Sequence, residues 1–251
     1  MIIGLVTEFT KLAHATVVRA TTALVVLGIS LLCSAMLLAV HTDDPQLAAK
    51  LGPLIDPGGW IGYLTVAIQV TGAAGFVGYG VVLSWLFSRE FADGTITGLF
   101  AIPVPRPTIA AAKLVVYLAW GLITAACLLA ALVVLGLANG LGPIPADAVP
   151  VMGRQFALSL FTIILATPAA WAATLGRSVL AGIGTTIVIL VLSQVSVIAG
   201  ADGWFPFAAP ALWAIHSDIT VGPLQLALVV PVVAVSVTLT LHSWQHLQLD
   251  R

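Results

Sequence analysis

Residues 86–113 read LFSREFADGTITGLFAIPVPRPTIAAAK, and the rest of the chain is organised around this polar stretch. The whole chain has nine basic and ten acidic residues, and five of these nineteen lie here: Arg89, Glu90, Asp93, Arg106 and Lys113. Long apolar runs lie on both sides of the stretch. We therefore interpret it as the place where an otherwise apolar chain meets something in water.

The composition is that of a membrane protein. Of the 251 residues 60% are hydrophobic and 8% are charged, against roughly 25% charged in an ordinary soluble domain. The mean hydropathy is +1.13. So few charges could not cover the surface of a soluble fold, which indicates an all-α integral membrane protein with one transmembrane domain over residues 1–251. No basic run suggests nucleic acid as a partner.

The apolar runs predict six transmembrane helices. Residues 20–40 carry no charge, and at about 1.5 Å per residue a helix of this length crosses a hydrocarbon core of about 30 Å. Before this run, residues 1–19 have apolar side chains at helical spacing and charges on the opposite side, which predicts an amphipathic helix in the membrane interface. The spans are expected at about 20–40, 60–87, 114–138, 151–175, 179–199 and 223–243.

The distribution of basic residues predicts the orientation. Six spans place both termini on one side, together with the polar stretch. That side holds seven basic residues: Lys11, Arg19, Arg89, Arg106, Lys113, Arg177 and Arg251. The other side holds two, Lys50 and Arg154. By the positive-inside rule we expect both termini and the polar stretch to be cytoplasmic.

Motifs for covalent chemistry are absent from the sequence. There is no GxxxxGK[ST] phosphate loop, HExxH, CxxC pair or GxSxG elbow, so we predict no catalytic site and no ATPase site on this chain. His242 and His246 are four residues apart, but only Asp250 is placed to add a third ligand, so no metal site is predicted. No acidic residue lies in the middle of a span, which disfavours a proton- or sodium-coupled carrier.

The polar stretch has the residues of a shaped docking surface. Ser88 is expected to cap a short helix through Glu90 and Asp93, whose carboxylates suit a helix start. Gly94 allows a bend, and three prolines are expected to stop the helix before the next span. A plain solvated loop is the simpler alternative, but a connector could be much shorter. Two basic residues are expected to reach lipid phosphates: Arg106 and Lys113.

The pattern Glu-x-x-x-Gly-Thr, then Pro-x-x-Arg-Pro and a Lys before the next span, resembles the permease subunits of ABC-2 type exporters. The matching residues are Glu90, Gly94, Thr95, Leu99, Pro103, Arg106 and Lys113. The layout of an amphipathic start and six spans is also similar, over nearly the whole chain. The resemblance implies that residues 89–100 contain a cytoplasmic coupling helix between spans two and three. Arg89 belongs to it, with Glu90 and Asp93 as polar contacts for a separate ATPase subunit.

The resemblance further implies a permease subunit of an ATP-driven exporter in a bacterial cytoplasmic membrane, surrounded by lipid. Two permeases, identical or similar, would pair with two ATPase subunits. ATP and Mg²⁺ would be held by the ATPase, and this chain would hold no cofactor. An apolar path without charges suits a hydrophobic or amphipathic cargo such as a drug, an antibiotic or a lipid.

Candidate residues lining the path lie in the second and fifth spans: Gln69, Gly72, Gly75 and Gln194. The alternative for the two glutamines is hydrogen bonding between helices, and the alternative for the glycine face, which includes Gly78, is close packing or a hinge. Two other functions stay open at this point. One is a proton- or sodium-coupled secondary transporter, and the other is a non-transporting intramembrane enzyme or scaffold.

Overall fold

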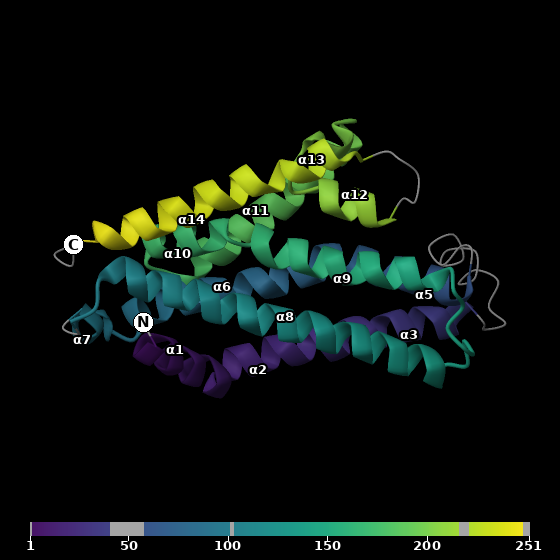
Figure 1. The fold of residues 1–251 in the computed structure, drawn as a ribbon, viewed down its shortest axis with the longest axis horizontal. Coiled ribbons are helices and arrows are strands. Elements are labelled where there is room, and N and C mark those ends of the chain that lie inside the picture. Colours follow the sequence, from purple (N-terminus) through teal and green to yellow (C-terminus); the bar gives the residue numbers. More distant parts are fainter. Residues whose placement is uncertain (1, 41–57, 101–102, 216–220, 248–251) are drawn as a thin grey trace.

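The computed structural model describes residues 2–40, 58–100, 103–215 and 221–247, and this part of the chain contains helices and no strands. Six segments are long and apolar enough to cross a membrane: Thr16–Ala39, Gly59–Ala92, Arg106–Ala138, Ala148–Gly176, Val179–Ile198 and Pro223–Gln245. The prediction of an all-α integral membrane protein is confirmed. The N-terminus, α7 and the last turn of α14 lie at one end of the elongated bundle, which we call the motif end (Figure 1).

The first two spans each contain one π-helical turn. Helix α1 (Ile2–His14) precedes a span made of α2 (Thr16–Ala23), η1 (Leu24–Gly28) and α3 (Ile29–Val40). The second span consists of α5 (Gly59–Val70), η2 (Thr71–Gly75) and α6 (Phe76–Ala92). A π turn contains an extra residue, and such turns are frequent at functional sites. The two π turns contact each other inside the bundle.

The second span continues further toward the motif end than predicted. It has 34 residues, or about 50 Å of helix against a hydrocarbon core of about 30 Å. Ser88 therefore lies inside α6, where its hydroxyl donates to the carbonyl of Ser84 at 2.6 Å, and it does not cap a new helix. The helix ends at Ala92, and the chain turns at Gly94, whose φ of 66° is left-handed and favours glycine. The short α7 (Ile96–Phe100) follows.

The third span, α8 (Arg106–Ala138), begins earlier than the sequence suggested. The structure places Pro107 in its first turn. The first N–H groups of a helix need no partner within the helix, so a proline is accommodated there and fixes a helical φ. Pro105 and Pro107 therefore lie at the start of a helix. The prediction that they would end one is wrong.

The remaining helices complete the bundle. The fourth span is divided at Pro168 into α9 (Ala148–Leu165) and α10 (Pro168–Gly176), and a tight turn leads into α11 (Val179–Ile198). The aromatic loop that follows contains η3 (Asp202–Trp204) and α12 (Ala209–Ile215), which packs against α9 and α5. The sixth span consists of α13 (Pro223–Ala227) and α14 (Val229–Gln245).

Helix α6 packs most closely against α11, where small residues face each other. A Cβ added at Gly80 of α6 would lie 2.6 Å from Cγ2 of Thr186, and one added at Gly182 of α11 would lie 2.7 Å from Cβ of Ser84. Gly78 similarly approaches Val25 of the first span. Close packing through glycine, one of the roles weighed for the second span, thus occurs at Gly78 and Gly80.

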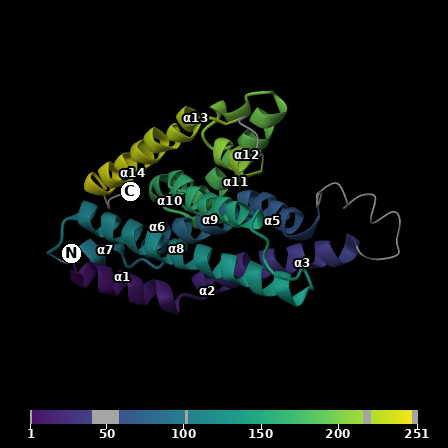
Figure 2. The same cartoon turned by 45° about the vertical axis from the view of Figure 1, so that its right-hand side comes forward.

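The fifth and sixth spans are covered least by the rest of the chain. Helices α11 and α14 form one flank of the bundle (Figure 2). Large apolar side chains of α11 are exposed along its length: Leu180, Ile187, Val188, Val191, Leu192, Val195 and Ile198. A membrane-spanning helix can leave such a face to lipid or to another subunit.

Candidate functional site

The charged side of α1 is turned into the protein. Glu8 is 2% exposed, whereas Val6 and Phe9 on the other side are more than half exposed. The sequence had suggested the reverse, with the charges facing water. In contact with lipid the apolar side is favourable outside, and the charged groups are satisfied by partners inside the fold.

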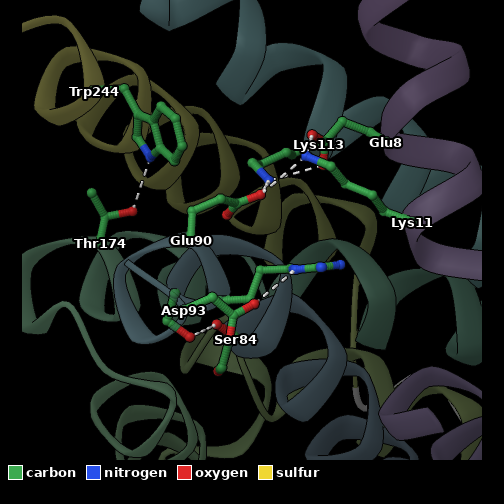
Figure 3. A network of polar contacts seen from close by, with 10 residues as sticks. Glu8, Lys11, Ser84, Glu90, Asp93, Lys113, Thr174 and Trp244 are labelled. Atoms are coloured by element: carbon green, nitrogen blue, oxygen red, sulfur yellow. Dashed lines mark hydrogen bonds and ion pairs between the residues drawn. The ribbon is translucent and has the colours of Figure 1, made fainter. Parts of the chain in front are cut away.

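Four charged side chains from three helices meet at the motif end. Lys113 of α8 places its Nζ 2.8 Å from Oε2 of Glu8 and 2.7 Å from Oε1 of Glu90 in α6. Lys11 places its Nζ 2.9 Å from Oε1 of Glu8 and 3.5 Å from Oε1 of Glu90. Figure 3 shows the two ammonium groups converging on the two carboxylates. We call Glu8, Lys11, Glu90 and Lys113 the ion cluster; it joins α1, α6 and α8.

The burial of the ion cluster changes two sequence-based expectations. Lys113 is fully buried, so it does not reach lipid phosphates, and Glu90 is only 2% exposed. The Glu90 carboxylate is therefore not available for direct contact with another protein. Breaking a buried ion pair by removing one partner typically costs about 3–5 kcal/mol, since it leaves a charge without compensation.

The electrostatic surroundings keep Glu8 ionised. Burial alone would raise the pKa of its carboxyl, but the ammonium groups of Lys113 and Lys11 outweigh burial and lower the pKa below the ordinary value of 4.5. The charge and the hydrogen bond of Lys113 lower the pKa of Glu8 more than those of Lys11 do. At neutral pH the Glu8 carboxylate is therefore ionised where it meets the ammonium groups of Lys113 and Lys11.

Trp244 of α14 connects the ion cluster to the short helix α7. The indole packs edge-on against Phe87 of α6 and Phe100 of α7, with ring centroids 5.9 and 6.2 Å away. Lys113 Nζ lies 5.9 Å from the centroid of the same indole. The indole Nε1 donates to the hydroxyl of Thr174 in α10 at 3.1 Å (Figure 3). Helix α7 is thus tied to α6, α8, α10 and α14 through one side chain.

Arg106 holds the other side of α7. Its guanidinium lies 4.3 Å from the ring centroid of Phe100 and donates to the carbonyl of Leu247 at 2.6 Å. The Phe100 ring therefore contacts both the indole of Trp244 and the guanidinium of Arg106. Arg106 is used within the chain, and its expected role at lipid phosphates is replaced by this contact.

The turn between α6 and α7 is the exposed part of the polar stretch. Asp93, Gly94 and Thr95 are exposed, and Asp93 Oδ2 lies 3.8 Å from Nε of Arg89. Leu99 is half-buried against the core. The residues that the resemblance assigned to coupling thus divide into two groups. Glu90 and Arg106 make contacts between helices of this chain. The residues of the turn are exposed and accessible to another protein.

A cavity of about 320 Å³ lies under α12 and opens to the surface of the chain, where Gln69 and Gln194 are exposed. In Figure 1, α12 lies in the half of the bundle away from α7. The walls come from the second, fourth and fifth spans and from α12, and they include Gln69, Gly72 and Gln194. Three of the four proposed path-lining residues therefore meet at one cavity. The fourth, Gly75, is buried, and the nearest atoms to it belong to Thr71 and Tyr79 of its own span.

The two histidines of α14 lie side by side. The ring centroids of His242 and His246 are 4.4 Å apart. Within the described ranges no group of three His, Cys, Asp or Glu residues is arranged to hold a metal ion. Asp250, the third ligand considered from the sequence, lies outside those ranges.

Comparison with known proteins identifies the family. A model of the ABC-2 family transporter protein matches residues 4–194. A bacitracin transport permease protein of Bacillus licheniformis is 48% identical over 42 residues, which cover 17% of this chain and 20% of that protein. No solved structure matches. Because the family model covers most of the chain, including α1, the ion cluster and the turn before α7, the protein belongs to the ABC-2 family of transporter proteins.

Proposed function

We propose that this chain is the permease subunit of an ATP-driven exporter, and that its ATPase subunit docks at the motif end. The observation that carries the proposal is the connection of the exposed α6–α7 turn to the buried ion cluster and Trp244. A force applied to Asp93 or Thr95 reaches four other helices through packed side chains. Such contiguous contacts between stiff helices are a physical route for coupling.

The docking surface consists of the exposed turn and the outer side of α7. Asp93, Gly94, Thr95, Thr97 and Gly98 are all exposed there. The excess of basic residues at this end supports a cytoplasmic position for it and for both termini in a bacterial cytoplasmic membrane. That is the side where a soluble ATPase and its bound ATP and Mg²⁺ are available. This chain then supplies the path and the ATPase supplies the hydrolysis.

A second permease, identical or similar, completes the transporter. The exposed apolar sides of α11 and α14 are the surfaces available to it, and lipid covers the remainder. Two permeases and two ATPase subunits would then move together. Closing of the ATPase pair on ATP would displace α7 and α6, and the spans would rearrange to release cargo outward.

The cargo is a hydrophobic or amphipathic compound, and an antibiotic is the first candidate. One supporting observation is that the cavity under α12 has no charged wall. Another is the short stretch similar to a permease named for bacitracin transport. An antibiotic exporter of this kind would lower the concentration of the compound in the producing or resistant cell.

The test is recovery of the ATPase. We would co-purify the permease with a candidate phosphate-loop ATPase subunit, comparing wild type, Asp93→Lys and the matched control Asp147→Lys. Asp147 is also an exposed acidic residue, but it lies at the other end of the bundle, just before α9. We expect wild type and Asp147→Lys to retain the ATPase and Asp93→Lys to lose it.

Other outcomes contradict specific parts of the proposal. Equal recovery with all three proteins would move the docking surface away from the α6–α7 turn. If the wild type recovers no ATPase, ATP-driven export itself is contradicted. Transport should then be measured with and without a proton gradient.

A further inference from the structure

The cavity under α12 contains polar groups that the chain itself does not use. Four neutral polar side chains line it: Gln69, Thr162, Ser193 and Gln194. The hydroxyls of Thr162 and Ser193 donate to the carbonyls of Ser159 and Ile189, both at 2.8 Å, which leaves their oxygen lone pairs as acceptors. The side-chain amides of Gln69 and Gln194 have no hydrogen-bond partner in the described chain.

Gln69 and Gln194 are exposed on apolar spans, so in a membrane their amides face the opening of the cavity without a partner from the described chain. A polar group without a hydrogen bond in hydrocarbon costs several kcal/mol. A third glutamine nearby is paired through its nitrogen only: Nε2 of Gln155 donates to the hydroxyl of Thr71 at 2.8 Å, while its buried Oε1 has no partner among the described residues. Hydrogen bonding between helices, the alternative weighed for Gln69 and Gln194, is therefore realised at Gln155 and not at those two residues. A hydrogen-bond partner for these two exposed amides would be water, lipid or another bound molecule.

The remaining walls are apolar and define the kind of partner. Phe76, Leu158, Leu165 and Leu190 contribute hydrocarbon surface, and none of the lining residues is charged. The volume of about 320 Å³ corresponds to on the order of ten water molecules. It lies at the small end of the roughly 300–1,000 Å³ of ligand sites. The cavity is too large for one structural water and accommodates part of a larger molecule.

We infer that this cavity binds the uncharged part of an amphipathic molecule, with an apolar body and neutral groups such as a hydroxyl, amide or ester. The amides of Gln69 and Gln194 would donate to and accept from those groups, and the hydroxyls of Thr162 and Ser193 would accept. The site lies within one chain, because its walls come from the second, fourth and fifth spans, from α12 and from the loop before it. As a cargo site it rests on the proposed export function, but binding itself does not.

The experiment uses two photoreactive probes of equal chain length in lipid nanodiscs. One is a diazirine-bearing long-chain alcohol, and the other is the corresponding fatty acid, which carries a charge. After irradiation the labelled residues are located by mass spectrometry. We expect the alcohol to label α5, η2 and the second half of α11 in preference to the fatty acid. We expect the double variant Gln69→Leu/Gln194→Leu to reduce this labelling about tenfold, as the loss of two hydrogen bonds implies.

Controls separate the site from general partitioning into the bilayer. Gln245→Leu makes the same chemical change at an exposed residue outside the cavity, and labelling should be unchanged. Gly72→Ala narrows the cavity without a clash, because the added Cβ would lie 3.6 Å from Cβ of Ala211, and labelling should fall. Labelling that is spread evenly over the outer side of α11 and insensitive to the double variant would overturn the inference.

Competition distinguishes the two sources of such a molecule. Displacement of the alcohol by bacitracin but not by added phospholipid would identify the site with an exported compound. Displacement by phospholipid alone would identify it with a bound lipid. ATPase recovery is measured on the same preparations. If the alcohol and the fatty acid label equally while the ATPase is still recovered, only the cavity proposal is contradicted. If the labelling difference is present but no ATPase is recovered, only the proposed exporter is contradicted.

Discussion

Lys113 and Glu90 form a 2.7 Å ion pair inside the protein although 23 positions separate them in the chain. The pair closes the base of the loop that contains the α6–α7 turn and α7. The loop can project into water while its two ends stay fixed to each other. We expect the ends of the loop to move together whenever α7 is displaced.

The Lys113–Glu90 pair predicts a non-additive mutational effect. Glu90→Gln should lower the free energy of unfolding by about 3–5 kcal/mol, because Lys113 then keeps only part of its compensation. Glu90→Gln/Lys113→Met should recover part of that loss, since neither buried charge remains. Thermal unfolding in detergent measures both. Asp93→Asn, at an exposed acid of the same helix end, should change stability by less than about 0.5 kcal/mol. Additive losses would argue that the pair does not stabilise the fold.

The contact between α6 and α11 predicts opposite effects for two glycines. Gly80→Ala should cost about 1–3 kcal/mol through overpacking, because the new methyl meets Thr186. Gly184→Ala, in α11 with no atom within 4 Å of the added Cβ, should be neutral or stabilising by up to about 1 kcal/mol. Denaturation midpoints of the two variants can be compared directly. Equal midpoints would mean that α6 and α11 are not in close contact.

The lowered pKa of Glu8 predicts how stability depends on pH. A carboxyl whose pKa is lower in the folded than in the unfolded state stabilises the fold above its unfolded pKa, and this contribution is lost as pH falls through the folded pKa. Stability should therefore fall as the solution is acidified below the ordinary value of 4.5. Glu8→Gln should start from a lower melting temperature at pH 7 and lose less on acidification. Parallel curves for the two proteins would contradict the prediction.

Trp244 predicts a graded series. Trp244→Phe removes the hydrogen bond to Thr174 but keeps an aromatic ring against Phe87 and Phe100, and should cost about 1 kcal/mol. Trp244→Ala removes the ring contacts as well and should cost about 3–5 kcal/mol. Unfolding of the wild type and of both variants, followed by circular dichroism, measures these losses of stability. A Phe variant as unstable as the Ala variant would assign the stabilisation to the hydrogen bond instead of the rings.

Much of the fold follows from hydropathy in the sequence. The six spans and the helix before them are visible because lipid contact requires long apolar runs. The ends were less accurate at the polar stretch, where Ser88 looked like a cap and Pro107 like a stop. A serine can also lie inside a helix and donate to a backbone carbonyl of the preceding turn, as Ser88 does. A proline can also lie in the first turn of a helix, as Pro107 does.

The ion cluster could not be predicted from sequence patterns alone. Glu8, Glu90 and Lys113 lie far apart in the chain, and each by itself resembles an ordinary interfacial charge. The π turns were equally hidden, since η2 has the composition of a small-residue helix. A helical wheel drawn through all of residues 59–92 assumes the same angle between successive residues throughout. The extra residue of the π turn η2 rotates the faces of the helix after it relative to those before it. The glycines within and after η2 therefore meet different neighbours, the cavity at Gly72 and other helices at Gly78 and Gly80.

The composition of the ion cluster also determines what happens when α1 separates from the bundle. Helix α1 brings one carboxylate and one ammonium, Glu8 and Lys11, and the rest of the protein brings Glu90 and Lys113. Each side is neutral by itself and already has its own ion pair. Detachment of α1 therefore leaves no net charge behind on either surface, and water can enter between two internally compensated pairs. The junction is strong when closed and electrostatically reversible.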